Sequence, residues 1–277
     1  MASPSPLMQL PCELRLMIYA YLFDAGEAEQ ERPPRLASDR NSAKTISIRH
    51  DAEWKPLATP SAPTRNRYHV IAHSINRRCV ETTYRLANTG ASFCPGLMRV
   101  NRAVYAEIAE LVYGGHVFDF GSDVEAVRPF FEDLTSETRR LVTKLALYKK
   151  GPWLYDCWSD RCEWRAMCTY LRDQPSVKHL RLVIQAGRVA KGQESEVVGR
   201  RELSKNDMAL LIDIRHDTLY WIADVLSLKG LRDIEVTPDF CIIPPPQTSN
   251  MRVFLAFSAS IQTGVKEYLR EQLQLPC

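Results

Sequence analysis

The histidine and cysteine residues are the side chains whose chemistry could hold a metal ion. His69 and His73 lie four residues apart, and Cys79 and Cys94 follow them. Imidazole and thiolate groups are the ligands that zinc prefers. The spacing is not that of a structural zinc finger, and Val70 stands where the metalloprotease motif H-E-x-x-H has its glutamate. We therefore expect no metal site and no cofactor.

Motifs that identify common enzyme classes are also missing from the sequence. It has no G-x-S-x-G nucleophile elbow, no phosphate-binding glycine loop and no dinucleotide fingerprint. The six histidines and the carboxylates are scattered, so no residue is singled out as a general acid or base. We expect no enzymatic activity and see no evident small-molecule substrate. An enzyme of unrecognised type is kept only as a weaker alternative.

The composition is ordinary for a globular protein. The 277 residues are 45% hydrophobic and 25% charged, and 36 basic against 33 acidic residues give a net charge of +3. This balance does not indicate a nucleic-acid partner, and no apolar run is long enough to span a membrane. Glu13 and Arg15 interrupt the apolar N-terminal stretch, which argues against a secretory signal. We therefore expect reduced cysteines and a location in the cytoplasm or nucleus.

The first element able to position an interaction surface lies near the start of the chain. Residues 10–22 have the apolar spacing of an amphipathic helix, and Pro11 and Glu13 suit its first turn. A helix this short is unstable alone in water, so we expect its apolar face to be buried, by this protein or by another one. That face consists of Leu14, Met17, Ile18, Tyr21 and Leu22.

A second helical pattern covers residues 97–113, and Gly114 and Gly115 end it. We expect this segment to supply part of the surface that covers the first helix. Its apolar face consists of Leu97, Val100, Val104, Ile108 and Leu111.

Together the two helical stretches resemble the F-box-like domain that is common in fungal proteins. This resemblance implies a protein-interaction role, often that of a substrate receptor docking on the Skp1 adaptor of a ubiquitin ligase. Unlike an ordinary F-box, the chain separates its two helical stretches by residues 23–96, and no tryptophan follows closely after the second. The residues that carry the resemblance are Leu10, Pro11, Glu13, Ile18, Tyr19 and Leu22, then Val100, Asn101, Arg102, Tyr105, Glu107, Leu111, Val112 and Tyr113.

Two functions follow from this resemblance. In the first, Leu10, Pro11, Ile18 and Leu22 help to engage a Skp1-like adaptor while the body, residues 116–277, binds an unknown target. In the second, the protein is a scaffold or recognition module without adaptor binding, and the same residues are simply core.

Residues 24–96 have the composition of a partly disordered insertion, with repeated prolines and polar residues. Residues 45–49 alternate apolar and polar side chains, which predicts a short strand. Residues 68–88 have apolar residues partly in phase with a helix. We accordingly divide the chain into an F-box-like helical unit (1–23 with 97–115), this insertion, and a body (116–277).

The body is expected to be α/β, with α+β as an alternative. One pattern, apolar-x-x-apolar-x-apolar, occurs at 142–147, 177–182 and 231–236, each time after an expected helix. It resembles the strand of a leucine-rich repeat; an ordinary sheet whose strands share the pattern by chance is the alternative. Because helices join the strands, we expect a small, largely parallel sheet capped by a C-terminal helix at 249–273.

Helices within the body show the same kind of pattern as the opening helix. Residues 159–173 place Trp164, Met167, Cys168 and Leu171 on one helical face, which we expect to be buried. A further helix is expected at 216–228. Periodicity does not decide whether residues 208–214 are helix or strand.

The loops after the three patterned strands should meet at one edge of a parallel sheet, where α/β folds bind ligands. These loops carry aromatic residues and arginines, which are enriched in protein interfaces. We expect this edge to bind a protein partner; the alternative is that Trp153 and Trp158 pack beneath their own loop. Nucleic acid is a weaker alternative, because glutamates interrupt the basic residues. The candidate residues are Trp153, Tyr155, Trp158, Arg188, Arg200 and Phe240.

Overall fold

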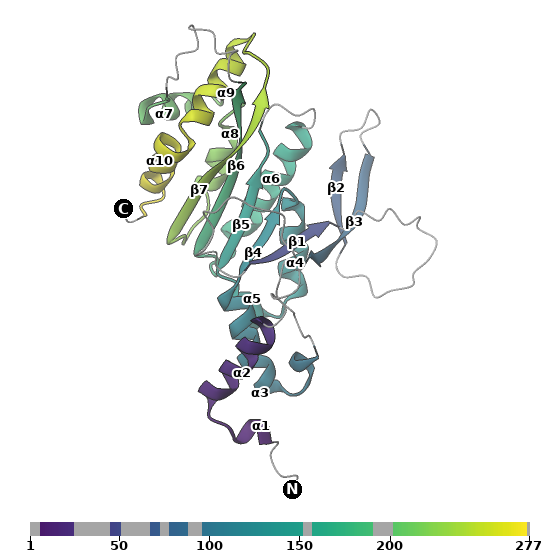
Figure 1. Cartoon of the computed structure of the whole chain (residues 1–277). Helices are drawn as coiled ribbons and strands as arrows, with labels where there is room; N and C mark the ends of the chain where they lie inside the picture. The colour runs from purple at the N-terminus through teal and green to yellow at the C-terminus, as the bar shows by residue number, and fades with distance from the viewer. Residues whose placement is uncertain are drawn as a thin grey trace.

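The computed structural model describes residues 6–24, 45–50, 67–72, 78–87, 96–151, 157–190 and 202–275. These residues form a twisted sheet covered by helices, with a smaller group of helices extending from one end (Figure 1). Within the described residues the α-helices are α1 Pro6–Gln9, α2 Cys12–Asp24, α3 Arg102–Ala109, α4 Val127–Asp133, α5 Ser136–Leu141, α6 Cys157–Arg172, α7 Lys205–Asp213, α8 Tyr220–Leu226, α9 Ser249–Ala259 and α10 Lys266–Gln272.

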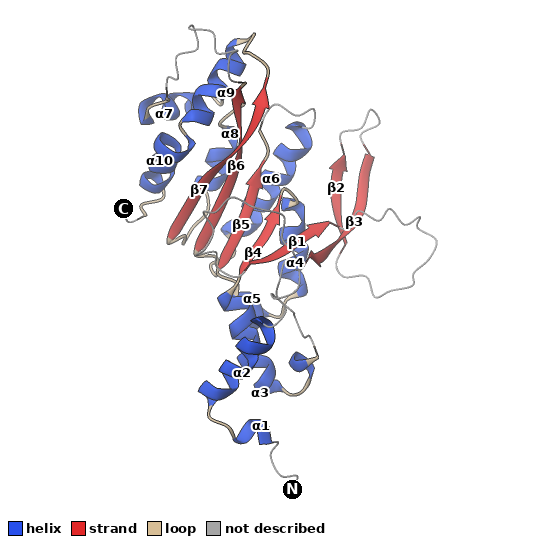
Figure 2. Cartoon of the chain, in the orientation of Figure 1, coloured by secondary structure: helices blue, strands red, loops and turns tan. Residues whose placement is uncertain are grey.

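The sheet has seven strands in the order β2-β3-β1-β4-β5-β6-β7 (Figure 2). Neighbours from β1 through β4 to β7 run parallel, whereas β3 is antiparallel to both β1 and β2. The expected α/β class with a largely parallel sheet is therefore confirmed. The strands are β1 Thr45–His50, β2 Arg67–Ala72, β3 Arg78–Ala87, β4 Val117–Gly121, β5 Lys144–Lys149, β6 His179–Val189 and β7 Asp233–Ile243.

The three segments that share one pattern become neighbouring strands in matched register. Leu145 of β5 is opposite Leu180 of β6, which is opposite Ile234 of β7. Two residues further on, Leu147, Leu182 and Val236 are aligned in the same way. All six side chains are buried. The repeated apolar-x-apolar motif thus marks the covered face of a parallel sheet.

Helices α6, α8 and α9 pack on one another through an aromatic series. Trp164 of α6 contacts Trp221 of α8 edge to face, and Trp221 makes a similar contact with Phe257 of α9. Such T-shaped pairs are favourable in addition to the area they bury. The predicted apolar face of α6 is buried, and residues 208–214 lie mainly in the helix α7.

The opposite face of the sheet carries polar residues at aligned positions. Arg181 of β6 is opposite Glu235 of β7, and their side chains form a 3.6 Å ion pair. Arg49 of β1 forms a 2.9 Å ion pair with Asp119 of β4. Alternation of buried and polar residues is typical of a sheet with one face covered by helices and the other exposed to water.

The range 24–96 contributes strands to this sheet. The strand expected at 45–49 is confirmed as β1, which lies between β3 and β4. The helical interpretation of residues 68–88 is wrong, because β2 and β3 form an antiparallel pair there. The valine, isoleucine, threonine and tyrosine residues of this segment favour strands. The described strands of the range thus belong to the same sheet as the body; its other residues lie outside the described ranges.

The C-terminal helix expected at 249–273 is interrupted. A π-helical turn, Ile261–Val265, separates α9 from α10. Just before it, the Ser260 hydroxyl donates to the carbonyl of Ala256 and accepts a hydrogen bond from the Leu203 backbone N–H, and such serine contacts often bend helices. The helical segments pack along β6 and β7, the last strands of the sheet. Gly187 allows this close approach, since a Cβ there would lie 2.8 Å from the Phe254 ring.

Candidate functional site

The short helices α2 and α3 lie side by side at the end of the molecule that is farthest from the carboxyl ends of the long strands (Figure 1). They come from residues 12–24 and 102–109. The two stretches that carry the F-box resemblance are therefore neighbours in space, although residues 23–96 separate them in the sequence.

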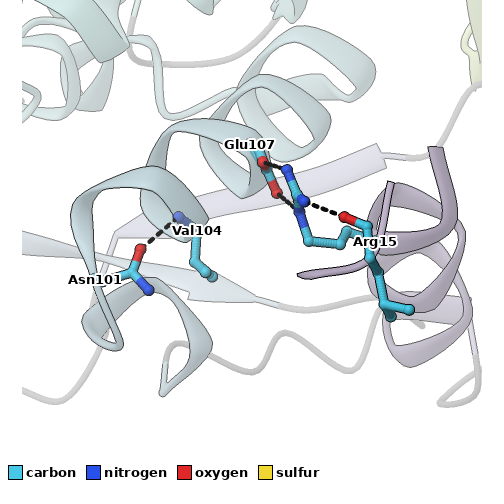
Figure 3. Close-up of polar contacts among 5 residues, drawn as sticks. Arg15, Asn101, Val104 and Glu107 are labelled. Carbon is cyan, nitrogen blue, oxygen red and sulfur yellow. Dashed lines mark hydrogen bonds and ion pairs between the residues drawn. The ribbon is translucent and has the colours of Figure 1, made fainter. Parts of the chain in front are cut away.

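A charged contact joins the two helices. Arg15 of α2 reaches across to Glu107 of α3, and its Nε donates to one carboxylate oxygen at 3.0 Å while its Nη2 contacts the other (Figure 3). The Arg15 guanidinium also donates to the backbone carbonyl of Leu10. The side chains are 13% and 17% exposed. Two parallel donor–acceptor contacts of this kind fix the relative orientation of the two helices as well as their distance.

The same contact determines the charge state of the pair. The hydrogen bond from Arg15 lowers the pKa of Glu107, against the opposing effect of burial. The hydrogen bond to Glu107 raises the pKa of Arg15. Both groups are therefore held in their charged forms, and burial raises the pKa of the neighbouring Tyr19 hydroxyl.

Helix α3 begins with a capping contact that fixes its direction. The Asn101 side chain accepts a 2.9 Å hydrogen bond from the backbone N–H of Val104 (Figure 3). This contact satisfies one of the free donors of the first turn. Val104 and Ile108 then face inward and are buried. Glu107 is thereby presented toward α2 from a helix whose other side is anchored in the core.

The buried side of α2 is not the one that its apolar spacing indicated. Tyr19 is fully buried and lies one helical turn after Arg15, so these two residues mark the side that contacts α3. The residues expected in the core are instead exposed, by 39% for Ile18 up to 74% for Tyr21. Helix α3 contacts the side of α2 that carries Arg15 and Tyr19, and burial of the apolar face by another protein stays a prediction. We call the exposed set, Leu14, Met17, Ile18, Tyr21 and Leu22, the apolar stripe.

The four adaptor-binding candidates lie together at this end of the molecule. Ile18 and Leu22 belong to the apolar stripe, and Pro11 is exposed just before α2. Leu10 is partly buried, and its carbonyl group accepts from Arg15. Sequence reasoning missed the role of Arg15. The available signal was that Arg15 is a charged residue in an otherwise apolar helix and therefore requires a counter-charge. Glu107 is a charged residue within the second helical segment in the same way.

The proposed edge after the three strands is described only in part. Arg188 and Phe240 lie within β6 and β7, so the expectation that they belong to loops was wrong. Both strands continue well past their repeated motif, with Arg188 opposite the exposed Ile242 and Phe240 opposite Ala186. Trp153, Tyr155 and Arg200 lie outside the described residues, as does the side chain of Trp158.

Neither metal ligation nor membrane insertion is indicated within the described ranges. They contain no cluster of three or more histidine, cysteine, aspartate or glutamate residues able to hold a metal ion. None of their helices combines the length and the apolar character needed to cross a membrane. Comparison of the chain with models of protein families, with curated proteins and with solved structures found no match.

Proposed function

We propose that the chain is a non-enzymatic protein-interaction module, an F-box-type substrate receptor whose α2–α3 unit docks on a Skp1-like adaptor. The observation that carries this proposal is the exposed apolar stripe on α2, a helix whose other side is fixed to the protein by Arg15 and Tyr19. Contiguous apolar surface of this kind is characteristic of interaction sites, since water contact with it is unfavourable.

The arrangement of α2 suits docking because the helix is already oriented. The Arg15–Glu107 contact and the capped start of α3 fix its direction before a partner arrives. A surface held in its binding conformation loses less conformational entropy on association than a flexible one. Leucine, isoleucine, methionine and tyrosine side chains on such a surface can then be buried against a complementary groove.

The alternative function is a scaffold or recognition module without adaptor binding. In that interpretation the apolar residues of α2 are core. The exposure of Ile18 and Leu22, at 39% and 41%, counts against it.

Binding of the second partner, the target, is assigned to the far end of β6 and β7. There Phe240 and Ile242 are exposed on β7, the edge strand, beside Arg188 of β6. Aromatic, aliphatic and arginine side chains at an open edge are the composition found in protein interfaces. This surface lies at the other end of the sheet from α2, so both partners have room to bind at once (Figure 1).

The test is co-purification of the full chain with Skp1. The substitution Ile18→Asp places a charge in the middle of the apolar stripe and should abolish the association. Leu210→Asp is the matched control, since Leu210 is an exposed apolar residue on α7, in the body. It should leave the association intact.

The thermal unfolding midpoint of each variant shows whether it is still folded. The proposal fails if wild-type protein does not associate with Skp1. It also fails if folded Ile18→Asp protein associates as well as the wild type.

A further inference from the structure

A pocket of about 440 Å³ opens at the carboxyl end of β5 and beside Ile184 and Gln185 in the middle of β6, where α6, α8 and α9 converge. The carboxyl end of β5 lies at the opposite end of the sheet from α2 (Figure 1). The carboxyl edge of parallel strands is where α/β folds commonly bind ligands, and the volume is within the range of small-molecule sites. The residues of the pocket are distinct from the apolar stripe, so what it binds is independent of the adaptor proposal.

A buried lysine lies in the wall of this pocket. Lys149 is the last residue of β5, is only 3% exposed and forms an ion pair with Asp160 of α6. Its ammonium also donates to the carbonyl oxygen of Lys150 at 3.1 Å. The ammonium also lies 5.4 Å from the centroid of the Trp164 ring and 5.9 Å from that of the Tyr220 ring, so ring contacts add to its two hydrogen-bond partners. Burial lowers the pKa of Lys149, while Asp160 opposes this shift and favours the charged form.

A second cation lies at the mouth of the pocket. The Arg161 guanidinium stacks over the Tyr220 ring at 4.1 Å from its centroid. Its ion pair with Asp217 is loose, at 3.9 Å, and the Asp217 side chain is 75% exposed. An exposed pair with this geometry contributes little, so the guanidinium can accept a better anionic partner without a large loss. Lys150 also lines the pocket and adds positive charge.

The remaining walls are mainly apolar. Trp221, Met251, Phe254 and Phe257 line the pocket, and all four are buried against the helices and the sheet. These side chains exclude water from one part of the pocket, and the cations lie on another. Most small-molecule sites have this division between an apolar body and a few converging polar groups.

We infer that this pocket binds a small organic anion with an apolar, ring-sized body and a carboxylate group. The carboxylate would accept hydrogen bonds from Arg161, with Lys150 adding positive charge, while the body packs against Trp221 and Phe254. Among the described lining residues Asp160 pairs with Lys149 and Asp217 pairs loosely with Arg161, so Lys150 leaves the lining with a net positive charge. That charge selects an anion over a neutral or cationic molecule of the same shape.

The test uses two probes of nearly equal shape, 2-naphthoate and its neutral analogue 2-naphthamide. Isothermal titration calorimetry on the full chain should give a dissociation constant for 2-naphthoate at least about tenfold lower than for 2-naphthamide, the size expected for one charge-assisted hydrogen bond. Arg161→Gln should remove most of this difference. Arg161 is a partly exposed residue, so the variant should remain folded, with an unchanged thermal unfolding midpoint.

Arg165→Gln is the matched control. Arg165 lies one turn further along α6, pairs with Asp224 and does not line the pocket, so its loss should leave both dissociation constants unchanged. The inference is overturned if 2-naphthoate does not bind, if the two probes bind equally, or if Arg165→Gln weakens 2-naphthoate as much as Arg161→Gln does.

Discussion

Helices α2 and α6 have similar apolar spacing, but the apolar face of α6 is buried and that of α2 is exposed. On α6, Trp164, Met167 and Leu171 are at most 3% exposed. On α2, the five residues of the apolar stripe are all exposed. The spacing of apolar residues therefore shows that a helix has a face to bury, but not which surface buries it.

The difference comes from what lies next to each helix. Helix α6 contacts β2, α4 and α8. Its contact with α8 is made by Trp164 and Trp221. Helix α2 is next to α3, which continues directly into the π-helical turn Glu110–Gly114. The contact with α3 covers the side of α2 that carries Arg15 and Tyr19, whereas the apolar stripe on the other side is 39–74% exposed.

The two regions also use their ion pairs differently. In the body, Lys149 and Asp160 are almost completely buried. The helices around them also contact one another through aromatic side chains, without the help of this ion pair. In the helical unit, the Arg15–Glu107 pair is the main polar contact between α2 and α3 among the described residues. Loss of the Arg15–Glu107 pair should therefore loosen α2 locally, whereas the stability of the body depends on its apolar packing.

The largest effect should come from Trp164→Ala. Trp164 is fully buried and contacts Trp221, so its removal leaves a cavity in the core. The expected loss in the free energy of unfolding is about 3–5 kcal/mol, measured by chemical denaturation. Tyr21→Ala is the matched control, because it also removes a large aromatic side chain, but from the exposed stripe. It should cost less than about 0.5 kcal/mol. Equal losses for the two variants would contradict the contrast between the helices.

A second effect, which depends on pH, should come from Glu125, a carboxyl group that the body buries. Burial, and next the nearby Glu163, raise the pKa of Glu125 from about 4.5 to about 8. The folded protein therefore retains a proton that the unfolded chain releases between these two values. This group stabilises the fold fully below pH 4.5, and its contribution decreases as the pH rises toward 8, by at most about 1.4 kcal/mol per pH unit.

Replacing Glu125 with glutamine should remove that dependence. Denaturation of Glu125→Gln between pH 5 and pH 8 should show a flatter decline than the wild type, with the difference largest at pH 8. Glu137→Gln changes an exposed carboxyl group on α5 and should follow the wild-type curve. If the free energy of unfolding changes with pH equally in the wild type and in Glu125→Gln, then this carboxyl group is already ionised in the folded protein.

The sequence predicted the sheet better than it predicted the site. The strands β5, β6 and β7 carry the same local pattern, and that pattern aligns their buried residues because each motif meets an identical one. The hairpin β2–β3 was missed, since its apolar residues are also partly in phase with a helix and only pairing between strands decides the matter.

The site was harder to predict because it depends on contacts between distant segments. Arg15 and Glu107 are 92 residues apart, and nothing in either helix alone identifies its counterpart. Local periodicity showed that the apolar stripe requires a partner surface, and only the three-dimensional neighbours of α2 show that the stripe is exposed in this chain. Likewise, Arg161 and Phe254 come from separate helices and meet only at the pocket.

The smallest effect on global stability should come from Glu107→Gln, which tests the local role of the ion pair. Glutamine keeps the shape of the side chain but removes the charge and one acceptor that Arg15 uses. Hydrogen exchange should then become faster for the amides of α2 and stay unchanged for β5. Met17→Ser, on the exposed stripe, should change neither segment.

Tryptophan fluorescence separates this local effect from unfolding of the body, because none of the five tryptophans belongs to α1, α2 or α3. The denaturation curve of Glu107→Gln should therefore overlay that of the wild type. If the curve shifts as far as that of Trp164→Ala, then α2 and the sheet unfold as one cooperative unit. The exposed stripe would in that case belong to a helix stabilised by the whole fold, rather than to one that its local contacts with α3 hold in place.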